Sequence, residues 1–321
     1  MCYNIELKRD SMKASNIINI RESKVFNNNI KNDIRILSAG DFHINKYTKE
    51  DNINFYLDNV YKEDPNYICL LGDLIDNPLD INDCVDLLYK LVKNSSTIAP
   101  TFIILGNHDF IHKDSTIINK QIWDNINNID NVCLLNDKLY KNDEIVIMGY
   151  TQKIEAYYNY NRDIVSDSDV FYNDFVKHDE LYNVDNNLPK VALIHSPEYL
   201  TEERNIELLK NYDITICGHY HNGCVPPILD KLWNSDRGVI NARRYLFPKN
   251  VRGILKLDNG NYLIYNGGWV KLSKSSAKEL SFLDNLFNRQ IDVTILTNDP
   301  ECQNIKVKHK YIKKVFKNVA F

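Results

Sequence analysis

Short runs of apolar residues recur along the chain, and each run has the length of a buried β-strand. Stretches with apolar residues at helical spacing separate several of these runs. Strands that alternate with helices in this way predict an α/β fold with a mostly parallel sheet. The clearest predicted strands cover residues 34–39, 67–71, 101–105, 131–135, 144–149, 191–194 and 214–216, followed by a hairpin over 254–257 and 262–265.

Apolar residues three and four positions apart give the predicted helices one buried face. In one of them, Leu88 and Leu91 share such a face. A further hairpin through Tyr140 is expected to join the strands at 131–135 and 144–149. Predicted helices cover residues 50–65, the segment after Asp80, 116–127, 170–177 and 201–211.

The two ends of the chain differ from this central part. Residues 1–33 are rich in Asn, Lys and Ser and predict an edge hairpin or a loosely packed lead-in to a main domain over 34–275. Residues 276–321 predict a helix and a lysine-rich strand packed on the same domain. Residues 305–321 hold six lysines and no acid. Their alternation predicts a lysine-faced strand that protects a sheet edge, with lipid or nucleic-acid binding as the alternative.

The composition is that of a globular protein without a disulfide framework. The 321 residues are 44% hydrophobic and 26% charged, as in an ordinary globular protein. The net charge of −4 argues against a broad nucleic-acid footprint. The seven cysteines show no CxxC spacing, which favours a reducing compartment. No signal peptide or membrane-spanning run stands out. We therefore expect a cytoplasmic protein and leave peripheral membrane contact open.

Metal-ligand residue types follow five of the predicted strands. Open α/β sheets place their sites at the carboxyl ends of strands, so these residues are expected to meet there. A lone Asp-x-His or a lone histidine would be a weak signal, but the recurrence makes chance an inadequate explanation. The candidate ligands are Asp41, His43, Asp73, Asn107, His195, His219 and His221.

Seven oxygen and nitrogen donors are more than one octahedral ion needs, so the set predicts two divalent ions. Asp73 follows the strand predicted to be central and is the expected bridge. Two ions about 3.5–4 Å apart lower the pKa of a bridging water, which predicts a metal-bridging hydroxide as nucleophile in phosphoryl transfer. His108 is left as a non-ligand imidazole that can stabilise the phosphoryl group or protonate the leaving oxygen. Asp76 and Asp109 are expected to orient it.

The chain resembles the calcineurin-like metallophosphoesterase superfamily in the order of its motifs. From Asp41 to His221 these are D-x-H, G-D, G-N-H-D, H and G-H-x-H. This resemblance implies a four-layer αββα sandwich, in which two mixed β-sheets pack face to face and are flanked by helices. It implies Mn, Fe or Zn as the metals, His108 as the catalytic histidine and Asp76 as its partner. By resemblance, one ion would be held by Asp41, His43, Asp73 and His221, and the other by Asp73, Asn107, His195 and His219.

The chain after His221 is similar to bacterial phosphoesterases of the superfamily that are associated with membrane or envelope substrates. Those proteins usually carry GHTHGGQ where this chain has GHYHNGC. A basic and aromatic stretch offers Arg243 and Arg244 as substrate-binding candidates, and a turn at Gly267–Gly268 is expected near the site. Residues 157–188 predict a lid or a solvated connecting segment. Asn77 stands where protein phosphatases of the superfamily carry arginine, which counts against protein substrates.

Three functions remain open. The first is a metal-dependent phosphohydrolase that cleaves phosphomonoesters or phosphodiesters in small-molecule or lipid-like substrates. The second is a nuclease acting on DNA or RNA, for which a steep salt dependence of binding would be the sign. The third is a non-catalytic scaffold that keeps the metallophosphoesterase fold as a binding surface. Such a scaffold is expected to lose ligands or the non-ligand histidine, and this chain keeps them all.

Overall fold

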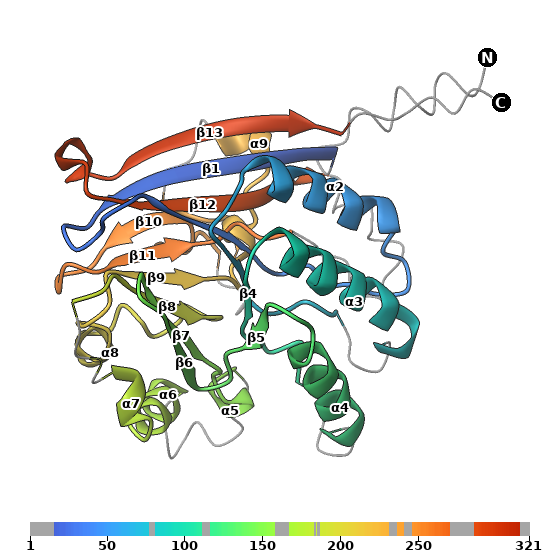
Figure 1. Ribbon diagram of the computed structural model, residues 1–321, viewed down its shortest axis with the longest axis horizontal. Coiled ribbons are helices and arrows are strands. Elements are labelled where there is room, and N and C mark those ends of the chain that lie inside the picture. The colour runs from blue at the N-terminus through green and yellow to red at the C-terminus, as the bar shows by residue number, and fades with distance from the viewer. Residues whose placement is uncertain are drawn as a thin grey trace.

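Two mixed β-sheets form the centre of the computed structural model (Figure 1), which describes residues 16–76, 81–110, 116–157, 167–182, 184, 187–230, 236–240, 246–269 and 286–314. The seven-stranded sheet has the order β13-β1-β12-β2-β3-β4-β5. Its strands β2 to β5 run parallel, and β12 and β13 each pair antiparallel with a neighbour. The strands are β1 (Ile17–Phe26), β2 (Ile34–Ala39), β3 (Tyr67–Leu70), β4 (Thr101–Ile103), β5 (Val132–Leu134), β12 (Arg289–Thr297) and β13 (Lys306–Lys313).

The six-stranded sheet has the order β10-β11-β9-β8-β7-β6. Strands β7, β8, β9 and β11 are parallel, and the edge strands β6 and β10 close antiparallel hairpins. The carboxyl ends of these four parallel strands therefore lie along one edge of the six-stranded sheet. The carboxyl ends of β2 to β5 lie along one edge of the seven-stranded sheet in the same way. The strands are β6 (Lys138–Lys141), β7 (Val146–Tyr150), β8 (Lys190–Ile194), β9 (Ile214–Cys217), β10 (Gly253–Lys256) and β11 (Tyr262–Tyr265).

Alternating side chains of the strands build three apolar layers, because successive residues of a strand face opposite sides of its sheet. In β2, Ile36 packs between the two sheets and Leu37 packs toward the helices. In β8, Leu193 packs between the sheets and Ala192 packs outward. The sheets thus lie face to face, as the sequence predicted from its resemblance.

Helices cover both outer faces (Figure 1). Residues of α2 (Glu50–Lys62), α3 (Ile81–Ile98) and α4 (Thr116–Asn127) pack on the seven-stranded sheet. The other outer layer contains residues of α6 (Asp167–Phe175), α7 (Asp179–Tyr182) and α8 (Glu203–Leu208). This is the four-layer αββα sandwich. Shorter helical pieces are α5 (Ile154–Tyr157), η3 (His221–Cys224), α9 (Pro227–Asp230) and η6 (Pro300–Cys302).

The first strand corrects the expectation of an edge hairpin or loose lead-in. Strand β1 lies inside the seven-stranded sheet between β12 and β13, and most of its residues are buried. Its sequence hides this position because polar residues occupy alternate positions of the strand, yet Asn19, Arg21 and Ser23 are all buried. Arg21 and Ser23 contact polar partners on β12, Asp292 and Thr294.

Strand β12 is a second element that the sequence did not predict. Residues 286–314 contain no α-helix that corresponds to the helix predicted in 276–321, only the short 3-10 helix η6, and residues 276–285 lie outside the described part of the chain. The lysine-rich strand is confirmed as β13, and it forms one edge of the seven-stranded sheet. Its residues are mostly exposed.

Two connections also differ from the predictions. The strands predicted at 131–135 and 144–149 are not partners, because β5 belongs to the seven-stranded sheet while β6, which contains Tyr140, forms the hairpin with β7. The described part of 157–188 is not a solvated connection either. Phe171, Phe175 and Leu181 are almost fully buried against the six-stranded sheet.

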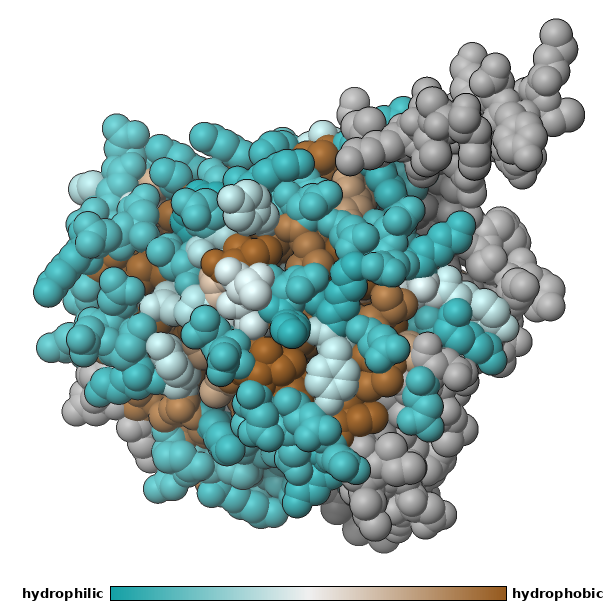
Figure 2. Space-filling model, turned by 45° about the vertical axis from the view of Figure 1, so that its right-hand side comes forward, coloured by the Kyte–Doolittle hydropathy of each residue, from teal (hydrophilic) through white to brown (hydrophobic). Residues whose placement is uncertain are grey.

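Polar residues dominate the surface in the view of Figure 2, and hydrophobic residues show mainly in its central part. Among the helices of the described residues, none is both long enough and apolar enough to cross a membrane. The six cysteines within this part of the chain are free thiols.

Candidate metal centre

The candidate ligands come together where the carboxyl ends of the two sheets meet. The loops after β2 and β3 run side by side, since the Asp41 N–H donates to the Gly72 carbonyl (2.9 Å) and the His43 N–H donates to the Asp73 carbonyl (3.0 Å). Across from them, the Gly218 N–H after β9 donates to the His195 carbonyl after β8 (2.9 Å). Backbone pairing between loops therefore holds each half of the site.

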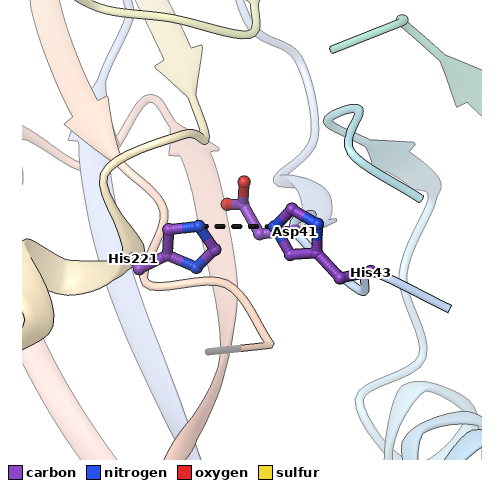
Figure 3. Close-up of side chains that lie close together, drawn as sticks. All are labelled: Asp41, His43 and His221. Carbon is purple, nitrogen blue, oxygen red and sulfur yellow. Dashed lines mark hydrogen bonds between the residues drawn. The ribbon is translucent and has the colours of Figure 1, made fainter. Parts of the chain in front are cut away.

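The first cluster contains Asp41, His43 and His221, whose ligand atoms lie within 4.8 Å of one another. Figure 3 shows the two imidazoles converging beside the Asp41 carboxylate, with 3.4 Å between their Nε2 atoms. The His219 N–H donates to both Asp41 oxygens at 3.1 Å. The loop after β9 in the six-stranded sheet thus orients Asp41, a candidate ligand that follows β2 in the other sheet.

The second cluster contains Asp73, His195 and His219, again with ligand atoms within 4.8 Å. The Oδ2 atom of Asp73 lies 3.3 Å from His195 Nε2 and 3.8 Å from His43 Nε2, so it stands between the two clusters. His195 Nδ1–H donates to the Leu71 carbonyl at 2.6 Å. This bond fixes the tautomer and leaves Nε2 as the ligand atom, as in many metal-binding histidines.

Burial and charge shift the pKa values of these groups strongly. Burial raises the pKa of Asp41. Burial alone would raise the pKa of Asp73 as well, but the nearby His195 and His108 imidazoles lower it well below its usual value. Burial would depress the pKa of His195, yet the Asp73 carboxylate outweighs it and raises that pKa to about 9. Burial and the neighbouring His195 lower the pKa of His219 well below its usual value.

Left-handed backbone conformations concentrate at the site. An L-residue with positive φ costs about 1–2 kcal/mol, and such strain clusters at functional sites where the surrounding fold enforces it. Here the short loops place ligand side chains that a relaxed backbone would direct elsewhere. The candidate ligands with positive φ are Asp41 (54°), His43 (44°), Asp73 (50°), His219 (70°) and His221 (47°).

Two glycines allow the ligand loops to approach closely. A Cβ on Gly106 would lie 2.3 Å from Asp73 Oδ1, and a Cβ on Gly72 would lie 2.5 Å from the Gly106 nitrogen. Both positions exclude any side chain. The turn at Gly267–Gly268 is confirmed near the site, because a Cβ on Gly268 would lie 2.7 Å from Asp41 Oδ2.

The calcineurin-like phosphoesterase family model matches residues 34–223, which is more than half of the chain and contains every candidate ligand. The chain belongs to the calcineurin-like phosphoesterase family. An uncharacterized metallophosphoesterase of Helicobacter pylori strain J99 is 23% identical over 211 residues, 65% of this chain and 50% of the relative. One from Aquifex aeolicus is 24% identical over 215 residues, 64% of this chain and 72% of the relative.

The chain spans about half the length of the H. pylori relative that it matches. Among solved structures, a dimetal phosphatase from Danio rerio is 12% identical, with a TM-score of 0.42 over 75% of this chain and 89% of the other.

His108 adjoins the first cluster, and its ring meets the His43 ring edge-on at 4.7 Å. Its Nδ1–H donates to the main-chain carbonyl of Asp76 at 2.6 Å, so the contact with Asp76 uses the backbone. The Asp76 carboxylate instead accepts from Asn45 Nδ2 (3.0 Å) and lies 3.9 Å from His43 Nδ1. The bond to the Asp76 carbonyl leaves His108 Nε2 available, and His43, Asp76 and His108 form a third group whose candidate ligand atoms lie within 4.8 Å of one another.

Asp109 supports the loops rather than the His108 ring. Its carboxylate accepts hydrogen bonds from the main-chain N–H groups of Gly106 (2.9 Å), Leu74 (2.9 Å) and Ile75 (3.2 Å). These bonds join the loop after β3 to the loop after β4. Burial, followed by the nearby Asp73 charge, raises the pKa of Asp109 to about 7.

Tyr157 and Gln152 contact the site although no motif in the sequence indicated them. The Tyr157 ring lies 5.5 Å from the His219 ring, and its hydroxyl donates to Gln152 Oε1 at 2.8 Å. Gln152 also holds Ser196, next to His195, through the N–H (2.8 Å) and the carbonyl (3.1 Å). Gln152 follows β7 just as the ligands follow their strands, which is the signal that could have identified it.

Of the three remaining candidate site residues, the structure describes only Asn107. Asn107 is buried on the loop after β4, between Gly106 and His108. The candidate substrate contacts Arg243 and Arg244 lie outside the described residues, and so does Asn77.

The donors in this site fit the divalent metals of the family. Both clusters combine carboxylate oxygens with imidazole nitrogens and contain no thiolate, a set that suits Mn, Fe or Zn. The close approach of His43 Nε2 and His221 Nε2 is also explained, because two nitrogens that face one another at 3.4 Å can share an ion. The residues present therefore fit a divalent-metal site.

Proposed function

We propose that this protein is a phosphohydrolase that uses two divalent metal ions to cleave phosphomonoesters or phosphodiesters. The observation that carries the proposal is the place of Asp73 Oδ2, 3.3 Å from a nitrogen of one cluster and 3.8 Å from a nitrogen of the other. A carboxylate oxygen between two ligand sets suits a bridge between two ions. Asp41, His43 and His221 would complete one site, and Asn107, His195 and His219 the other.

When bound, the two ions would lower the pKa of a water that attacks phosphorus and stabilise charge on the reacting oxygens. The protein supplies the geometry. The Leu71 carbonyl holds His195 with Nε2 turned toward Asp73, and the Asp76 carbonyl holds His108 Nδ1–H. His108 Nε2 is thereby positioned to donate a proton to the leaving oxygen or to contact the phosphoryl group. His108 is the proposed catalytic residue, and Asp76 positions it.

The proposed substrate is a phosphorylated small molecule or a lipid-like phosphoester. The net charge of −4 gives little support to a nucleic-acid substrate, which keeps the nuclease as the second candidate. A cytoplasmic location, with peripheral membrane contact, stays part of the proposal. Mn, Fe and Zn are the candidate ions because nitrogen and oxygen donors accept all three.

The test measures metal content per chain together with hydrolysis of p-nitrophenyl phosphate and bis-p-nitrophenyl phosphate, before and after adding Mn²⁺. About two metals and Mn²⁺-stimulated turnover are expected. The preferred ester decides between a monoesterase and a diesterase. Folded protein that takes up no metal and hydrolyses neither ester would point to the non-catalytic scaffold instead. Cleavage of DNA or RNA in preference to both esters would support the nuclease.

A further inference from the structure

A buried polar group joins the two sheets beside the metal centre. It consists of Arg21, Asn266 and Asp292, which we call the inter-sheet clamp. Asn266 directly follows β11 of the six-stranded sheet, while Arg21 and Asp292 belong to β1 and β12 of the seven-stranded sheet. All three are at most 4% exposed. They lie outside residues 34–223, the part that the family model matches.

Hydrogen bonds connect the clamp to both sheets. Asn266 Nδ2 donates to Asp292 Oδ2 (2.6 Å) and to the Ser38 carbonyl of β2 (3.0 Å). The Arg21 guanidinium donates through Nε to Asp292 Oδ1 (2.7 Å) and through its NH2 group to the carbonyl of Tyr265, the last residue of β11 (2.8 Å). The end of β11 is therefore fixed to three strands of the opposite sheet.

The turn after β11, which begins at Asn266, contacts two loops that carry candidate ligands. The Asn266 N–H donates to the Cys217 carbonyl at the end of β9 (2.7 Å), two residues before His219. Asn266 Oδ1 accepts from the Gly268 N–H (2.8 Å). Gly268 has a φ of +65° and packs so closely on Asp41 that a Cβ there would lie 2.7 Å from Oδ2.

The next residue continues this arrangement, since the Trp269 N–H donates to the carbonyl of Gly40, which precedes Asp41 (3.0 Å). Asp41 is thus confined on one side by the turn that the clamp holds. On another side its carboxylate accepts from the His219 N–H. These contacts come from loops of the six-stranded sheet, while the Asp41 N–H donates to the Gly72 carbonyl within its own sheet (2.9 Å).

We propose that the inter-sheet clamp positions Asp41 for metal binding and fixes the separation of the two ligand sets. This inference rests on the proposed function, because it explains how the metal ligands of that site are held. A buried ion pair is a weak source of stability, since desolvation offsets its attraction, so stability alone does not account for it. Residues that orient metal ligands typically change metal affinity about 10–100-fold when they are replaced.

Asn266→Ala tests the clamp, and Asn261→Ala is its matched control. Asn261 precedes β11 as Asn266 follows it, is 2% exposed, and donates to the carbonyls of Tyr212 (2.8 Å) and Leu209 (3.3 Å). It lies at the other end of the strand from the metal centre. Both variants should lower the Tm of the chelator-treated protein, because each loses buried hydrogen bonds. Only Asn266→Ala should weaken Mn²⁺ binding, by about tenfold or more in isothermal titration calorimetry.

Arg21→Lys gives a second, milder variant. Lysine keeps the charge but lacks the planar fork that reaches both Asp292 and the Tyr265 carbonyl. Its Mn²⁺ affinity should fall between those of the parent and Asn266→Ala, and it decides the question if Asn266→Ala does not fold. A parent protein that binds two Mn²⁺ ions, with unchanged affinity in the folded variants, would overturn the clamp alone. A folded parent that binds none of Mn²⁺, Fe²⁺ and Zn²⁺ would overturn the proposed function and the clamp together.

Discussion

The Nε2 atoms of His43 and His221 lie 3.4 Å apart, although 178 positions separate the two residues in the chain. Their rings are nearly parallel, with an interplanar angle of 19°. One histidine follows β2 of the seven-stranded sheet and the other follows β9 of the six-stranded sheet. The candidate metal centre is therefore made by packing one sheet on the other, and a change in that packing would separate its ligands.

His108→Ala should lower the turnover of a phosphoester by about a hundredfold while the metal content stays near that of the parent. The reason is that His108 adjoins the first cluster but is not among its proposed ligands. Turnover and metal content are measured on the same preparation. His178→Ala serves as the control and should keep full turnover, because His178 is a half-buried histidine that contacts Tyr150 and belongs to none of the candidate ligand clusters. Loss of metal in His108→Ala would show that His108 is a ligand.

Asp73→Asn should reduce the occupancy of both metal positions, because the replaced oxygen lies between the two clusters. Metal analysis after dialysis against a fixed Mn²⁺ concentration measures the effect. Asp213→Asn is the control, since Asp213 is a carboxylate that accepts from the Lys190 N–H at the opposite end of β8. An Asp73→Asn protein with both positions filled would remove Asp73 as the bridge.

The metal-free protein should become less stable as pH rises from about 6.5 to about 9. His195 has a folded pKa of about 9 against an ordinary 6.5, so its contribution is complete below pH 6.5 and is lost as pH rises through 9. Mn²⁺ binding should strengthen over the same window, because the ion replaces the proton on Nε2.

Thermal unfolding of chelator-treated protein measures the first effect, and Mn²⁺ titrations at pH 6.5 and 8 measure the second. His195→Asn should flatten the decline in Tm. A metal-free protein whose Tm rises between pH 6.5 and 9 would contradict the assignment of the retained proton to His195.

Gly106→Ala should disrupt metal binding, because the added Cβ would lie 2.3 Å from Asp73 Oδ1. We expect Mn²⁺ affinity to fall at least about tenfold, as for other changes that displace a ligand. Gly260→Ala is the comparison, since Gly260 has a φ of +91° but no atom within 4 Å of its added Cβ. It should cost about 1 kcal/mol of stability and leave Mn²⁺ binding unchanged. Equal Mn²⁺ affinity in the two variants would argue against close packing at Gly106.

The sequence predicted much of the candidate site because each ligand follows an apolar run that forms a strand. Asp41, Asp73 and His195 could be assigned this way, since a short run buried on both faces leaves a local signal in the sequence. The same local rule did not find β1. There, Arg21 and its polar neighbours face inward, and only their partners on β12 explain why they can be buried.

The sequence was less informative about the contacts that orient His108. It suggested that Asp76 and Asp109 act on the His108 ring, whereas the Asp76 carbonyl contacts that ring and the Asp109 carboxylate accepts from loop N–H groups. Main-chain contacts of this kind carry no residue-type signal, because every residue offers the same carbonyl and almost every residue the same N–H.

The sequence by itself determined the strands that carry the ligands, the chemical types of those ligands and the family resemblance, because these depend on local periodicity and on residue identity. Only the tertiary structure decided how closely His43 approaches His221, where Asp73 Oδ2 lies relative to the two clusters and that Asn266 connects the sheets. Those relationships arise when two sheets pack face to face. The apolar layer between them sets distances that no local pattern encodes.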